Sequence, residues 1–338
     1  MSKKQNILEI LILRIIQFKI RRWFNLEKEL SVKNKYIKSI DNSPEKTWPN
    51  PDKIPGGEEI PFSLKNIKVI GKYLRSCIKE GELAIKSIKN NNDNFIHLIT
   101  DEQLNDFKKY AKSLGIDDIG FAKIPRQLIF KERAICYENA IVLIKEMDKD
   151  AISKAPSITT LKSVFETYDT LGILTNKLTD YLKENNFYAQ ASHPLGGLVL
   201  YPPLAQKAGL GWLGKHGLLI TPKFGSRQRI SAIFTSIDNL PYSKNNKHKW
   251  IGEFCDKCNK CVRKCPPKAI FDTAIIHPSK RETHIDRNKC LPYFNKNYGC
   301  SICLKECVFS NIDYNKIKKS FEKNKYNKGN VDKIENDE

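Results

Sequence analysis

The amino-acid sequence predicts an α+β protein with two folded domains, an α/β domain over residues 63–245 and a small cysteine-rich domain over residues 246–312. Helix-like and strand-like segments alternate up to about residue 240, a pattern typical of helices packed around one sheet. Eight of the ten cysteines fall between residues 255 and 307. The length of 338 residues also suits two domains, at roughly 150 residues for each domain.

Residues 1–24 predict a helix that is both apolar and basic. Isoleucines and leucines dominate it, but charged residues such as Arg14 and Lys19 interrupt them. The segment is too short and too charged to span a bilayer, which needs about 20 predominantly apolar residues. Two interpretations stay open. The helix lies on a membrane surface with Trp23 and Phe24 near the headgroups, or it packs on the body of the protein or on a partner.

Residues 25–62 are expected to form a linker, because prolines and glycines crowd residues 41–62. A helix is predicted over Phe62–Lys89 and a second over Thr100–Leu114. Thr100 followed by Gln103 is a capping-box pattern, and Gly115 ends the second helix.

The following segments complete the α/β pattern. Strands are predicted at Asp118–Ala122, at Ala140–Ile144 and at Phe187–Gln190, with a long helix over Lys162–Asn185 between the last two. The charged residues 313–338 are expected to be a solvated or frayed tail.

The cysteines form two runs with characteristic spacing, Cys255-x2-Cys258-x2-Cys261-x3-Cys265-Pro266 and Cys290-x9-Cys300-x2-Cys303-x3-Cys307. Two-residue spacings let one tight loop offer three sulfurs to a [4Fe-4S] cluster, while the last cysteine of a run points to the other cluster. The spacing therefore predicts two [4Fe-4S] clusters. We expect one to be held by Cys255, Cys258, Cys261 and Cys307, and the second by Cys265, Cys290, Cys300 and Cys303.

Other uses of these cysteines fit less well. Zinc sites usually space their Cys-x2-Cys pairs by about a dozen residues or more. Disulfide frameworks belong to short secreted chains, whereas no signal peptide is recognised here and a cytoplasmic protein is expected. Cys77 and Cys136 lie in apolar surroundings and are expected to be buried core thiols.

A glycine-rich segment, Pro203-Leu-Ala-Gln-Lys-Ala-Gly-Leu-Gly-Trp-Leu-Gly-Lys-His216, precedes the cysteines. It is not a dinucleotide fingerprint, because no strand leads directly into it and no acidic residue follows at the required distance. Glycines allow close backbone approach, Trp212 offers an apolar wall, and Lys215 and His216 offer hydrogen-bond donors. The segment thus predicts a large bound cofactor, with the candidate binding residues Gly209, Gly211, Trp212, Gly214, Lys215 and His216.

This segment, together with the cysteine frame that ends in Tyr298-Gly-Cys-Ser-Ile-Cys303, resembles epoxyqueuosine reductase, the cobalamin-dependent iron–sulfur enzyme that completes queuosine in tRNA. Ile220-Thr-Pro-Lys-Phe-Gly225 and the first cysteine run resemble the corrinoid reductive dehalogenases equally well. The resemblance covers roughly residues 100 to 312. It implies a nitroreductase-like α/β domain that holds cobalamin or another corrinoid, followed by a ferredoxin-like domain that delivers electrons to it.

The sequence also departs from these families. The queuosine enzyme has a catalytic aspartate in an Asp-Ser-Ala-Pro stretch, where this chain has Ala191-Ser-His-Pro194. Queuosine chemistry is therefore not favoured. A dehalogenase uses a tyrosine as proton donor, so Tyr201 and His193 are candidate catalytic residues. Each also has a structural interpretation, Tyr201 as a packed turn aromatic and His193 as a polar loop residue.

The charge of the chain suggests its partners. A formal net charge of +20 favours a polyanion, an anionic membrane surface or an acidic redox protein. tRNA is an alternative that we do not favour, because no RNA-binding motif accompanies the charge. An N-terminal helix on lipid would place the protein at the inner membrane face.

The sequence therefore predicts an iron–sulfur oxidoreductase that takes electrons from a low-potential donor and passes them through two clusters to a corrinoid or directly to substrate. The alternative is a two-cluster electron carrier without chemistry of its own. A third hypothesis has the basic surface binding tRNA or membrane, with structural or redox-sensing clusters.

Overall fold

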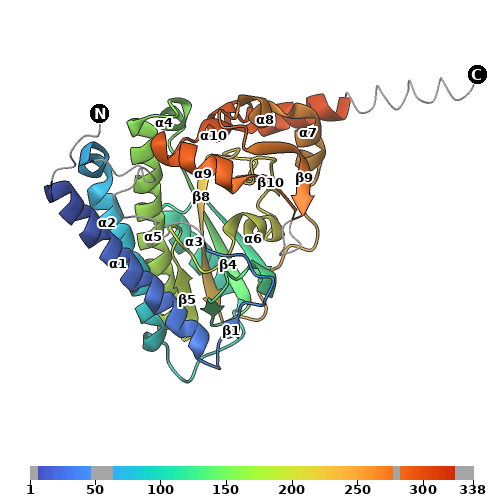
Figure 1. Cartoon of the computed structure of the whole chain (residues 1–338). Helices are drawn as coiled ribbons and strands as arrows, with labels where there is room; N and C mark the ends of the chain where they lie inside the picture. Colours follow the sequence, from blue (N-terminus) through green and yellow to red (C-terminus); the bar gives the residue numbers. More distant parts are fainter. Residues whose placement is uncertain (1–6, 47–63, 277–281, 324–338) are drawn as a thin grey trace, which may run out of the picture.

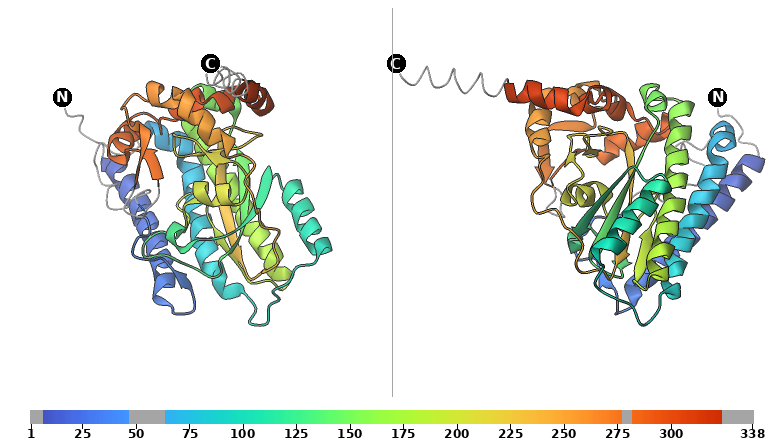
Figure 2. Two further views of the ribbon diagram at one scale, coloured as in Figure 1. Left: turned by 90° about the vertical axis from the view of Figure 1, so that its right-hand side faces the viewer. Right: turned by 180° about the vertical axis from the view of Figure 1, so that it is seen from behind.

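The computed structural model describes residues 7–46, 64–276 and 282–323 (Figures 1 and 2). A four-stranded antiparallel sheet in the order β2-β4-β8-β5 forms its centre. The strands are β2 (Asp118–Lys123), β4 (Asn139–Glu146), β8 (Gln228–Thr235) and β5 (Ala189–Ser192). The chain is thus a mixture of helix and strand, as the sequence predicts.

Helices cover both faces of this sheet because side chains alternate between the faces along each strand. Ile141 of β4 points to the face covered by α3 (Asp101–Ser113) and α5 (Ile158–Glu184). Val142 points to the opposite face, where α6 (Tyr201–Lys207) packs. The short helix α4 (Lys149–Ser153) precedes α5, and η3 (Arg126–Leu128) follows β2.

Two further helices lie outside α5. The helix α2 (Leu64–Lys86), continued by η2 (Ser87–Asn90), packs on α5 and β5, and α1 (Ile7–Val32) packs on α2 as the outermost layer (Figures 1 and 2). The Trp23 side chain is 1% exposed. A Cβ atom added at Gly81 would lie 2.2 Å from the Trp23 ring, so a glycine is needed where the two helices meet.

The N-terminal region corrects two expectations. The helix does not end at residue 24, because Leu30 is buried in the core and extends the packed face of α1. The expected linker begins as helix up to Val32, and β1 (Ile37–Lys38) then pairs with β3 (Ala134–Ile135). Residues 47–62 of that linker lie outside the described residues.

The other predicted elements are present with shifted ends. The capping box of α3 is confirmed, with Thr100 Oγ1 accepting from the Gln103 backbone N–H at 3.1 Å. The helix α5 begins earlier than expected because Ser157 caps it. Cys77 and Cys136 are buried, as predicted.

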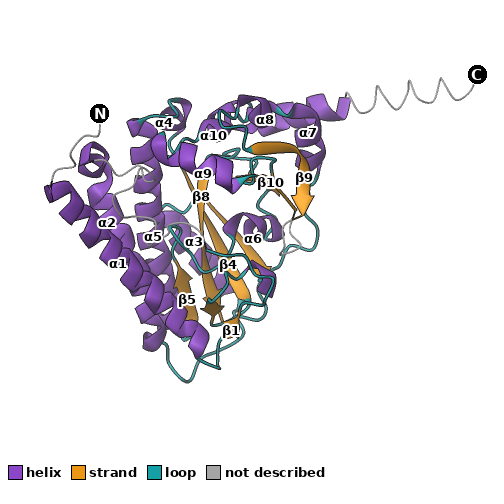
Figure 3. Cartoon of the chain, viewed as in Figure 1, coloured by secondary structure: helices purple, strands orange, loops and turns teal. Residues whose placement is uncertain are grey.

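The cysteine-rich part consists of short helices and a hairpin at one end of the sheet (Figure 3). Its helices are α7 (Trp250–Cys258), α8 (Lys260–Lys264), α9 (Arg287–Lys296), α10 (Ile302–Glu306) and α11 (Val308–Asn311), and its hairpin strands are β9 (Ile270–Ile276) and β10 (Glu282–Ile285). A second hairpin, β6 (Trp212–Leu213) with β7 (Leu219–Ile220), belongs to the glycine-rich segment.

The expected solvated tail is corrected in part. Residues 314–323 are helical, and Ile317 and Phe321 are buried. The Phe321 ring contacts those of Trp250 and Phe254 on α7, so burial of aromatic surface holds this helix in place. Within residues 7–46, 64–276 and 282–323, helices long and apolar enough to cross a membrane are absent.

Candidate functional site

Four cysteines from both runs share one small cavity. Cys255 and Cys258 come from α7, Cys261 comes from α8, and Cys307 comes from the turn between α10 and α11. All four line the same space, although about 50 residues of sequence separate Cys307 from the others. The structure thus brings together the first predicted set.

The other four cysteines are electrostatic neighbours of one another. Burial, with the nearby Cys300 and Cys265 next in effect, raises the pKa of Cys290 to about 11. Burial likewise raises the pKa of Cys303, and Cys300, Cys290, Cys261 and Cys265 follow in effect. The second predicted set therefore lies together, with Cys261 of the first set as its neighbour.

Hydrogen-bond donors surround the first set. Burial raises the pKa of Cys255 and of Cys307, which keeps a free thiol protonated at neutral pH. The backbone N–H of Lys215 acts on Cys255 in the opposite direction, as do the backbone N–H groups of Phe309 and Ser310 and the Ser226 hydroxyl on Cys307. Buried sulfurs that accept hydrogen bonds suit thiolates held by metal.

The spacing of these side chains does not suit a single ion. Among the described residues, three or more His, Cys, Asp or Glu side chains nowhere converge as a ligand set for one metal. A tetrahedral zinc site would require sulfurs about 2.3 Å from one point.

A larger cavity of about 590 Å³ lies beside both cysteine sets. The glycine-rich segment and α6 form one wall, and β10 with α9 forms the other. One cysteine of each set, Cys255 and Cys290, lines it. The volume falls in the range of about 300–1,000 Å³ typical of cofactor and small-molecule sites.

The glycine-rich segment contributes only part of its predicted residues to this cavity. Trp212, Gly214, Lys215 and His216 line it, whereas Gly209 and Gly211 do not. A Cβ atom at Gly211 would lie 2.1 Å from the carbonyl oxygen of Ile220 on β7. Close approach at Gly211 therefore serves the β6–β7 hairpin itself.

Lys215 joins the glycine-rich segment to the cysteine loop. Its side chain is buried, and the Nζ atom donates to Asn259 Oδ1 at 2.7 Å and to Asp272 Oδ1 at 2.8 Å. Asn259 lies between Cys258 and Cys261, and Asp272 lies on β9. The ammonium thus has protein partners, and it positions the cysteine loop against the hairpin.

His216 presents an unpartnered donor at the boundary of the two cavities. The backbone N–H of Leu218 donates to His216 Nδ1 at 3.2 Å, so the ring proton resides on Nε2 in the neutral form. Burial lowers the His216 pKa to about 4, which keeps the ring neutral at pH 7. The Nε2 atom is buried and has no hydrogen-bond partner among the described residues. His216 lines both cavities, and its Nε2 atom itself is buried next to Gly214.

The cavity wall also contains residues that were not predicted from the sequence, among them His284 and Arg287. His284 lies on β10, and its Nδ1 atom is 3.0 Å from the carbonyl oxygen of Phe271, which orients the ring. The stretch between the two cysteine runs looks like a spacer in the sequence. The signal that the sequence offers there is this pair of nitrogen-bearing side chains shortly before Cys290.

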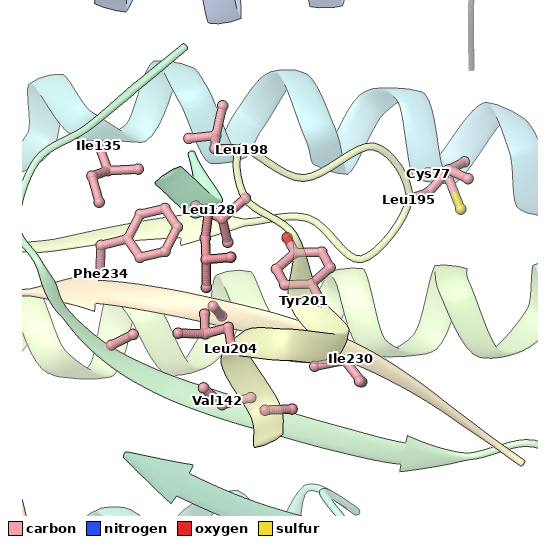
Figure 4. Close-up of a cluster of buried hydrophobic side chains, with 14 of the residues drawn as sticks. Cys77, Leu128, Ile135, Val142, Leu195, Leu198, Tyr201, Leu204, Ile230 and Phe234 are labelled. Carbon is pink, nitrogen blue, oxygen red and sulfur yellow. The ribbon is translucent and has the colours of Figure 1, made fainter. Parts of the chain in front are cut away.

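The two candidate catalytic residues lie away from the cavity. Tyr201 is buried in the hydrophobic cluster with Leu198 and Leu204 (Figure 4), and its hydroxyl donates to the carbonyl oxygens of Ser192 and His193, each at 2.8 Å. His193 is buried between the Trp23 ring of α1 and Gly172 of α5. Neither side chain lines the cavity.

The comparisons with known proteins give relatives of two kinds. A tetrachloroethene reductive dehalogenase of Desulfitobacterium hafniense is 30% identical over 225 residues, which cover 62% of this chain and 39% of that protein. An epoxyqueuosine reductase of Francisella cf. novicida (strain Fx1) is 35% identical over 130 residues, 33% of each chain. No protein-family model matches the sequence.

The solved structures agree on the fold. A reductive dehalogenase structure, described with a mechanism for B12-dependent dehalogenation, superposes with a TM-score of 0.58 and 17% identity, covering 76% of this chain and 40% of that chain. The chain spans about two fifths of the length of the dehalogenases that it matches. The predicted resemblance is confirmed: the chain is a distant relative of the reductive dehalogenases and the epoxyqueuosine reductases, and a close match to neither.

Proposed function

We propose that this chain is an iron–sulfur reductase in which two sets of four cysteines each hold one [4Fe-4S] cluster, beside a cavity that binds a corrinoid. The observation that carries the proposal is that Cys255 and Cys290, one from each set, both line the cavity. When bound, the clusters supply single electrons at low potential and the corrinoid supplies a reducible cobalt ion. In the same proposal, residues 63–245 form a nitroreductase-like domain and residues 246–312 a ferredoxin-like domain.

The residues around the cavity have separate roles in this proposal. Trp212 gives an apolar wall for a flat ring, and the His216 Nε2–H group donates to an electronegative atom of the bound molecule. Lys215 positions the cysteine loop through Asn259. His284 has its Nδ1 atom oriented by a backbone carbonyl, so Nε2 is the ring atom that would contact a bound molecule at the cavity wall.

The relatives support a reductive reaction. Those with the more extensive match are named tetrachloroethene reductive dehalogenases, and the others are named epoxyqueuosine reductases. The absence of an aspartate from Ala191-Ser-His-Pro194 weighs against queuosine chemistry. We therefore favour a small molecule as substrate over tRNA.

The surface beside the cysteine loop suits an acidic electron donor. Lys257, Arg263 and Lys264 are exposed on α7 and α8, next to Cys258 and Cys261. Positive charge at the point of electron entry would attract a negatively charged ferredoxin or flavodoxin. The rate of reduction by such a donor should fall as salt is added.

One anaerobic experiment tests the proposal. The protein is reconstituted with iron and sulfide, both are counted, and cob(II)alamin is titrated while its electron paramagnetic resonance spectrum is recorded. We expect about eight irons per chain and a changed corrinoid spectrum at stoichiometric protein. Eight irons with an unchanged corrinoid spectrum would leave only an electron carrier, and far fewer irons would contradict the cluster assignment.

A further inference from the structure

The orientation of α1 on the protein is determined by its inner face. Ile20, Trp23 and Phe24 are buried against the body of the protein. The buried Glu27 carboxylate accepts from Arg133 Nε at 2.9 Å and also pairs with Lys46. Trp23 and Phe24 are therefore unavailable to lipid headgroups, contrary to one of the two interpretations of the sequence.

The outer face of α1 carries a separate apolar stripe. Leu11 is 54% exposed, Ile15 is 49% exposed and Phe18 is 68% exposed. Their spacing of four and three residues places them on one side of the helix. Exposed apolar side chains are common singly, but three neighbours on one helix face indicate a binding surface.

Cations border this stripe. Arg14, Lys19, Arg21 and Arg22 are exposed, and the sequence from residue 11 to residue 26 contains no aspartate or glutamate. At about 100° per residue, Arg14 and Arg21 fall on one side of the stripe, Lys19 falls on the other, and Arg22 continues it. Arg22 also pairs with Glu82 of α2 at 3.2 Å while remaining half exposed.

We propose that the outer face of α1 binds the surface of an anionic membrane, with Leu11, Ile15 and Phe18 inserted at the level of the headgroups. An apolar stripe bordered by arginine and lysine is the composition of helices that lie in this interface. A second copy of the chain is a poor occupant, because it would bring two sets of four cations together. The inference is independent of the cofactors.

Vesicle co-sedimentation tests this proposal on the 338-residue chain. Vesicles of phosphatidylcholine alone are compared with vesicles that also contain phosphatidylglycerol, each at low and high salt. We expect binding only to the anionic vesicles, weakened by salt. The substitution Phe18→Glu should reduce the binding by about tenfold or more, since it places a negative charge in the stripe.

Leu98→Glu provides the matched control, because Leu98 is also 68% exposed but lies outside α1. It should bind as the native chain does, and thermal unfolding should show that both variants fold. Equal binding by Phe18→Glu and the native chain would overturn the proposal. A concentration-dependent dimer that Phe18→Glu dissociates would also overturn it, because the stripe would then be a self-interface.

Discussion

Asn259 and Ser301 occupy the same left-handed backbone conformation at equivalent points of the two cysteine runs. Asn259 has φ 48° and ψ 16° and precedes α8, and Ser301 has φ 64° and ψ 14° and precedes α10. Both helices are five residues long, pack against each other and end at a cysteine, Cys265 or Cys307. This local two-fold repeat turns the last cysteine of each run toward the opposite set.

The left-handed backbone conformation of Ser301 predicts that two substitutions at this position differ in how well the clusters are retained. Ser301→Gly should retain both clusters, because glycine adopts a positive φ without strain. Ser301→Val should lose iron, because a β-branched residue at this φ costs about 1–3 kcal/mol. Iron and sulfide counts after anaerobic reconstitution, and the decay of cluster absorbance in air, provide the measurement. Equal cluster lifetimes in the two variants would contradict the idea.

In the proposed arrangement, the last cysteine of each run is a ligand of the cluster held mainly by the other run. This arrangement predicts how many irons each double cysteine substitution removes. Cys265→Ala combined with Cys290→Ala removes two ligands of the same proposed cluster, so about four irons should remain per chain. Cys265→Ala combined with Cys258→Ala damages both clusters and should leave almost none. The opposite pattern in the iron counts would show that each run holds its own cluster.

The cysteine sets were predictable from the sequence because ligand spacing is local and specific. The far wall of the cavity was not, because His284 and Arg287 reach it through a hairpin whose position depends on long-range packing. The sequence also did not predict which face of α1 is buried, because apolar residues occur on all sides of that helix. The role of Tyr201 depends on two backbone carbonyls that the sequence does not reveal.

Lys215 allows a test of how charge near the first cysteine set influences its reduction potential. Lys215→Met removes a buried cation. Because reduction adds negative charge to the cluster, loss of this cation should lower the reduction potential, on the order of tens of millivolts. Asp272→Asn removes the anionic partner at 2.8 Å and should shift the potential upward. A redox titration monitored by electron paramagnetic resonance measures both shifts. If both variants shift the reduction potential in the same direction, the cause is a loosened cysteine loop and not the change of charge.

The burial of His193, which does not line the cavity, predicts an acid-sensitive contribution to stability. Burial lowers its pKa to about 4, whereas an unfolded histidine titrates near 6.5. Between these values the unfolded chain binds more protons, so stability falls as the pH decreases from about 6.5 toward 4. At pH 5.5 this term amounts to roughly 1 kcal/mol, at about 1.36 kcal/mol per pH unit.

Replacement of His193 by glutamine removes that titration while leaving an amide oxygen that can accept from the Leu195 backbone N–H, as His193 Nδ1 does at 3.1 Å. The variant should therefore lose less thermal stability than the native chain between pH 7 and pH 5.5. For a chain of this size the difference corresponds to roughly 2 °C in the unfolding midpoint at a fixed scan rate. Because His216 and any bound clusters respond to pH in both proteins, their effects cancel in the comparison. Parallel losses in the two proteins would mean that His193 is already protonated in the folded state, and that its contact with Trp23 tolerates the charge.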